Sequence, residues 1–99
     1  MRRERAAPMT QDEAESLAAR ALQFLADEPR LLARFLAVSG VAPREVRRAA
    51  AEPGFLAGVL DFLLAHEPDL MAFAAASGCP PAEIVKARAA LGPVESGQE

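Results

Sequence analysis

Residues 55–64 read FLAGVLDFLL and hold a single charged side chain, Asp61. The bulky apolar residues of this stretch fall on nearly every side of a helix, which is the pattern of a buried helix and not of an amphipathic surface helix. Such a helix needs neighbours around it. The chain has 99 residues, which is enough for one hydrophobic core and too short for two independent ones. The stretch therefore predicts a single domain built around a central buried helix.

The composition favours helices over strands. Hydrophobic residues make up 52% of the chain, but many of them are alanine, which has the highest helix propensity. Tyr and Trp are absent, and the β-branched residues Ile and Thr, which favour strands, are scarce. We expect an all-α domain, a compact bundle of about six short helices.

Capping residues and prolines mark where these helices begin and end. Thr10 and Glu13 have the spacing of a capping box, so the first helix is predicted to start there and to end near Asp27. Proline is tolerated in the first turn of a helix and not in its interior. It is expected to open the five later helices, near residues 29, 43, 53, 68 and 80–81. Residues 9–92 then form the domain, and residues 1–8 and 93–99 are expected to be flexible tails.

The chain resembles itself at an offset of 38 residues. Aligning residues 22–50 with residues 60–88 gives 11 identical pairs out of 29, including Ser39-Gly40 with Ser77-Gly78. Each copy would contain a helix, a proline-opened helix, a Ser-Gly corner and another proline-opened helix. The pattern predicts a duplication, with two related three-helix units around the central helix. The alternative is that two unrelated segments use similar capping residues.

The two copies differ in charge. The net charge of the chain is −3, yet the first copy carries five arginines and one acid between residues 30 and 48. Four of these arginines correspond to Ala72, Ala82, Val85 and Lys86 in the second copy. The outer face of the second copy is therefore mostly apolar, and we expect it to be covered by the rest of the domain or by a partner. The arginines form the candidate partner-binding basic face: Arg30, Arg34, Arg44, Arg47 and Arg48.

The segments FLADEPRLLARFLAVSGVAPREVRRAAAEPGFLAGVLDFLL and EPDLMAFAAASGCPPAEIVKARAAL together resemble a family of short bacterial proteins, domain of unknown function 3572. The resemblance covers about residues 14–91, and its FL, SG-x-x-P and PP-x-x-I-x-x-AR elements are specific as a set. The family carries no known activity or site. The resemblance therefore implies a small bacterial cytoplasmic helical protein and transfers no functional residue.

Two functions fit the basic face. We expect a non-catalytic protein-interaction module or adaptor that binds another protein through this face and through a groove between helices. The alternative is a helix-turn-helix-like DNA-binding protein using residues 30–48, in which Arg44, Arg47 and Arg48 reach phosphates or guanine edges. The acidic net charge counts against DNA binding. Pro43 also lacks a backbone donor at the head of the expected recognition helix.

We do not expect an enzyme, a cofactor or a metal site. His66 is the single histidine, and the acids beside it, Glu67 and Asp69, are interpreted as helix caps. The single Cys79 is interpreted as a small buried hydrophobe in a reducing cytoplasm, and one Cys with one His does not complete a zinc site. The apolar stretches are too short to span a bilayer, and the basic N-terminus runs into polar residues without the apolar core of a signal peptide.

Small residues follow one another along the central helix. Gly54, Gly58, Asp61 and Ala65 form a narrow strip on it. The strip marks either a close approach of another helix or a side that water reaches. If a helix crosses at Gly58, overpacking by Gly58→Leu would cost on the order of 1–3 kcal/mol.

Overall fold

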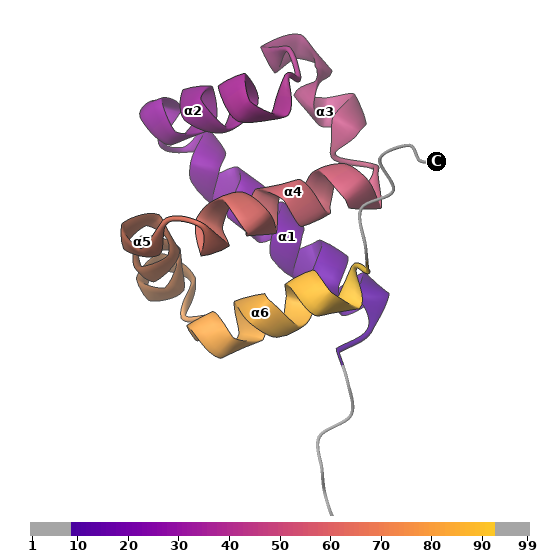
Figure 1. Cartoon of the computed structure of the whole chain (residues 1–99), viewed down its shortest axis with the longest axis vertical. Helices are drawn as coiled ribbons and strands as arrows, with labels where there is room; N and C mark the ends of the chain where they lie inside the picture. Colours follow the sequence, from indigo (N-terminus) through magenta and orange to yellow (C-terminus); the bar gives the residue numbers. More distant parts are fainter. Residues whose placement is uncertain (1–8, 93–99) are drawn as a thin grey trace, which may run out of the picture.

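The computed structural model describes residues 9–92, which fold as an all-α bundle (Figure 1). Over this range there is no strand. The all-α expectation is confirmed, and the two expected tails lie outside the described residues. The elements are α1 (Gln11–Ala26), α2 (Pro29–Ser39), the 3₁₀ turn η1 (Pro43–Glu45), α3 (Val46–Ala49), α4 (Pro53–Leu64), α5 (Glu67–Ser77) and α6 (Pro81–Ala90).

Local chemistry sets the helix ends as expected. Thr10 Oγ1 accepts from the Glu13 N–H at 3.1 Å, and Glu13 Oε1 accepts from the Thr10 N–H at 2.9 Å, so the capping box forms. Proline occupies the first turn of α2, α4, α5 and α6, where its missing N–H leaves no helical bond unmade. The expected third helix is a 3₁₀ turn followed by a single α-helical turn.

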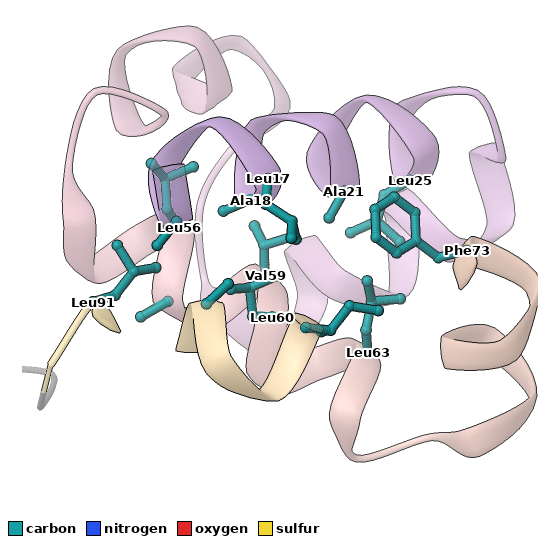
Figure 2. Packing of buried hydrophobic residues seen from close by; sticks show 14 of the residues in the cluster. Leu17, Ala18, Ala21, Leu25, Leu56, Val59, Leu60, Leu63, Phe73 and Leu91 are labelled. Carbon is teal, nitrogen blue, oxygen red and sulfur yellow. The ribbon is translucent and has the colours of Figure 1, made fainter. Parts of the chain in front are cut away.

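The core lies where α1 crosses α4 and α6. In Figure 1, α1 passes behind these two helices, α2 and α3 lie on one side of α4, and α6 lies on the other. The close view in Figure 2 shows the side chains of α1 pointing toward those of α4, with Phe73 of α5 at one end of the cluster. The buried residues of α1 are Ala14, Leu17, Ala18, Ala21 and Leu25, and those of α4 are Leu56, Ala57, Val59, Leu60 and Leu63. The expected central buried helix, α4, is confirmed, and α1 contributes as many buried residues to the core as α4 does.

The two Ser-Gly corners have the same local geometry. Gly40 and Gly78 end α2 and α5 in the left-handed conformation, with φ of 77° and 74°. Ser39 Oγ accepts from the Val41 N–H at 3.3 Å, and Ser77 Oγ accepts from the Cys79 N–H at 3.1 Å. The corners agree with a duplication, which itself stays a prediction.

The outer face of the second copy is not covered by the rest of the domain. Ala72, Ala82, Val85 and Lys86 are all exposed, and Val85 retains 54% of its surface. The expectation of cover from within the domain is wrong, because Ile84 and Ala87 occupy the inward positions of α6. The alternative, cover by a partner, stays a prediction.

No helix crosses closely at Gly58. A Cβ at this position would meet no atom of another helix within 4 Å among the described residues, so the condition under which Gly58→Leu was expected to overpack is not met. Gly58 instead lies at the surface of a groove between α2 and α4. Of the two explanations for the strip of small residues, the side open to water is the one that the structure supports.

No helix between residues 9 and 92 has the length and apolar character needed to cross a membrane.

We predict that Gly58→Ala raises the free energy of unfolding by about 0.5–1 kcal/mol, because alanine loses less backbone entropy in a helix interior and has room for its methyl group. Gly40→Ala is the matched control. At φ 77° an L side chain is strained, so the same substitution should cost about 1 kcal/mol there. Urea denaturation of the three proteins measures both effects; destabilisation by Gly58→Ala would contradict the open groove.

Candidate partner-binding grooves

The first groove runs between α1 and the η1–α3 segment and is called the α1–α3 groove. Its volume is about 590 Å³. The groove receives side chains from α1, α2, η1 and α3, and its last lining residue directly follows α3. The lining residues are Ala19, Leu22, Gln23, Ala26, Leu32, Pro43, Arg44, Val46, Arg47 and Ala50.

Helix geometry explains how α1 contributes to both the core and this groove. Ala14, Ala18, Ala21 and Leu25 follow one another at spacings of three and four residues and are completely buried. Leu22 and Ala26 repeat at the same spacing on the neighbouring face and line the groove. One face of α1 is therefore buried in the core, and the neighbouring face forms a wall of the α1–α3 groove.

The floor of the α1–α3 groove is apolar and its rim is positively charged. Leu22, Leu32 and Val46 are half-buried, whereas Arg44 and Arg47 are exposed. These two arginines are the charged residues among those lining the groove. Within residues 9–92, no carboxylate lies within salt-bridge distance of either guanidinium.

The second groove lies between α2 and α4 and is called the α2–α4 groove. Its volume is about 580 Å³. Phe35 stacks edge-to-face on Phe55 and Phe62, with ring centroids 5.3 and 5.5 Å apart, and Val38 stands 75% exposed at the opening. The lining residues are Arg34, Phe35, Val38, Ser39, Gly58, Asp61, Phe62, Ala65 and His66.

The charges around the α2–α4 groove are paired. Arg34 Nη2 lies 3.6 Å from Asp69 Oδ2, and its guanidinium carbon lies 5.8 Å from the centre of the Phe62 ring. Asp61 Oδ1 accepts from Arg88 Nε of α6. The rim of this groove is therefore close to electrically neutral, in contrast to the rim of the α1–α3 groove.

The five arginines of the candidate basic face do not form one site. The structure brings together Arg44 and Arg47 at the α1–α3 groove and places Arg34 at the α2–α4 groove. Arg48 Nη2 lies 3.6 Å from Glu45 Oε1 on its own segment. Arg30 is exposed and lines neither groove.

Glu67 and Asp69 lie in the first turn of α5, as expected of acids at a helix start, but the interpretation of their side chains as hydrogen-bonding caps is wrong. The N-cap of α5 is His66, and no side chain caps that end of the helix. The Asp69 carboxylate instead lies 2.7 Å from His66 Nδ1 and also faces Arg34, an arrangement that depends on how α2 packs near α5. Among residues 9–92, no group of three or more His, Cys, Asp or Glu side chains is placed to hold a metal ion.

A family profile described as Protein of unknown function (DUF3572) matches residues 11–94. The chain belongs to this family. No curated protein and no solved structure matches the chain.

Sequence reasoning missed the α1 wall of the α1–α3 groove in this DUF3572 protein. Ala19 and Ala26 are seven residues apart beside the apolar stripe of α1, and that spacing was the available signal. It does not distinguish a groove wall from an ordinary exposed face. The position of α3 opposite this face of α1 is what makes the face a groove wall.

The thiol of Cys79 is a buried apolar group, as expected. The residue is 8% exposed. Burial raises the pKa of the Cys79 thiol, Arg20 lowers it and Glu83 raises it, with a net increase. The thiolate is therefore disfavoured at neutral pH.

We predict that Cys79 reacts with a disulfide reagent at pH 7.5 several-fold more slowly than a free cysteine in solution, because the thiolate is the nucleophile and both burial and the raised pKa limit it. Stopped-flow absorbance with the native protein measures the rate. The same protein in denaturant is the control and should react at the rate of free cysteine. Equal rates in the native and denatured protein would contradict the buried thiol.

Proposed function

We propose that this DUF3572 protein is a non-catalytic interaction module that binds a partner protein in the α1–α3 groove. The observation that carries the proposal is the pair Arg44 and Arg47, which stand without carboxylate partners in residues 9–92 above a half-buried apolar floor. Protein interfaces commonly combine an apolar centre with arginine contacts, and arginine is enriched among the residues that dominate binding energy. Both parts are present here on one concave surface.

Catalysis has less support. The α2–α4 groove brings Ser39 near His66, and the Asp69 carboxylate holds the imidazole as an orienting acid holds a catalytic base. However, Ser39 Oγ donates to the Leu36 carbonyl and accepts from the Val41 N–H. Among the described residues, no hydrogen bond joins Ser39 to His66, so the serine serves the helix corner.

DNA binding also has less support. The segment that would act as the recognition helix, η1 with α3, spans only residues 43–49. It begins with Pro43, which has no N–H to donate to a phosphate. A DNA backbone would contact the arginines and leave the apolar floor of the groove exposed to water.

We also infer that the protein acts in a reducing compartment such as the cytoplasm. Cys79 is the single cysteine of the sequence and it is buried, so no disulfide forms within the chain. Such cysteine usage is typical of reducing compartments.

The proposal is tested by placing a charge in the groove. Ala19 is exposed on the α1 wall, so Ala19→Glu should leave the fold intact while burying a carboxylate against any bound partner. Ala33→Glu is the matched control, because Ala33 is exposed on α2 and lines neither groove. Both variants should unfold at nearly the same urea concentration as the wild type.

Affinity capture from the cells that make the protein, with quantitative mass spectrometry, provides the measurement. We predict a partner that wild type and Ala33→Glu retain equally and that Ala19→Glu retains at least about tenfold less. Desolvation of the added carboxylate by the bound partner costs more than the roughly 1.4 kcal/mol that corresponds to tenfold. Equal retention by all three proteins, or the absence of any retained protein, would contradict the proposed function.

A further inference from the structure

We propose that the partner presents an acidic amphipathic helix to the α1–α3 groove. This inference rests on the proposed function and adds the chemistry of the bound segment. Three features of the groove support it: its unpaired positive charge, the origin of its apolar floor and the small side chains of its α1 wall.

The charge of the groove selects an acidic ligand. Arg44 and Arg47 are three residues apart on the η1–α3 segment, and both line the same groove. Three other arginines have carboxylate partners, since Arg48 pairs with Glu45, Arg34 with Asp69 and Arg88 with Asp61. Within residues 9–92, Arg44 and Arg47 have no such partner. Carboxylates of a bound segment would relieve their mutual repulsion and gain charge-assisted hydrogen bonds.

The floor of the groove selects an apolar stripe on the same ligand. Leu22 comes from α1, Leu32 from α2 and Val46 from α3, so apolar side chains meet the ligand from three helices. A helix that carries apolar residues at positions i, i+3, i+4 and i+7 presents one continuous stripe to such a floor. Glutamates next to that stripe then reach Arg44 and Arg47 on the η1–α3 wall.

The α1 wall is compatible with close approach of a helix. Its lining residues Ala19 and Ala26 are exposed and carry only a methyl side chain. Gln23, between them, donates to Asp27 Oδ1 at 3.1 Å, which holds its amide along α1. A ligand helix therefore meets small side chains on one wall and two guanidinium groups on the other.

The inference is tested with a synthetic probe. The probe is a fluorescently labelled peptide of about 18 residues, long enough to form a helix in isolation, with leucines at i, i+3, i+4 and i+7 and glutamates at the flanking positions. A second peptide carries lysine at every glutamate position. Fluorescence anisotropy with the full chain, at low and at moderate salt, measures both affinities.

We predict that the glutamate peptide binds at least about tenfold more tightly than the lysine peptide, and that salt weakens its binding. The double variant Arg44→Glu with Arg47→Glu should weaken binding of the glutamate peptide by at least about tenfold and favour the lysine peptide. Arg30→Glu with Arg48→Glu is the charge-matched control, because neither residue lines the groove. It should change the affinity by about twofold or less, the effect of net charge alone.

Three outcomes overturn the inference. Equal binding of the two peptides, or an unchanged affinity after charge reversal at Arg44 and Arg47, removes the acidic helix as the ligand. Tighter binding of random-sequence duplex DNA than of the glutamate peptide, lost in the same variant, would point to a nucleic acid instead. In the case of equal peptide binding or of an unchanged affinity, loss of partner capture by Ala19→Glu would still support the interaction module, with a partner of different chemistry. If capture is also unchanged, the proposed function falls as well.

Discussion

The close packing of α1 against the rest of the core is the constraint on which the structure depends. Ala14, Ala18 and Ala21 are completely buried on α1, and Val59 and Leu60 are completely buried on α4. Small side chains at such positions let two helices approach closely, so the larger residues on either side interlock. Phe35 and Phe73, contributed by α2 and α5, are also buried in this core and anchor the outer helices to it.

The grooves follow from that packing. Because the inner face of α1 is used by α4 and α6, its neighbouring face remains available to form a wall beside α3. The short η1–α3 segment places no fully buried side chain in that contact, and two of its arginines, Arg44 and Arg47, are exposed and line the groove. On the other side of α2, the open strip of α4 around Gly58 leaves the second groove. The two grooves have similar volumes and differ in charge compensation, since the arginines that line the first have no carboxylate partner in residues 9–92 and Arg34 and Asp61 of the second are paired.

The sequence predicted what depends on residues near one another in the chain. The capping box at Thr10 and Glu13, the proline-opened helices and the left-handed glycines at the Ser-Gly corners all have local causes and appear as expected. The resemblance to the DUF3572 family is also confirmed. Helix number and order therefore required no knowledge of the packing.

The candidate site was less predictable, because it depends on how helices are placed in space. Arg34 and Arg44 belong to one charged stretch of sequence, yet α2 directs the first to one groove and the η1–α3 segment directs the second to the other. The pairing of Asp69 with Arg34 joins residues 35 positions apart, so a local capping rule misassigned the carboxylate. Whether Gly58 faces a helix or open space likewise depended on the path of α2.

The packing of α1 is tested by the free energies of unfolding of Ala18→Leu and Ala19→Leu, determined by urea denaturation. Ala18 is completely buried in the core, whereas its neighbour Ala19 is exposed at the groove. We expect a loss of about 1–3 kcal/mol for Ala18→Leu through overpacking and a change within about 0.5 kcal/mol for Ala19→Leu. Equal stabilities of the two variants would contradict the close packing of α1 against the core.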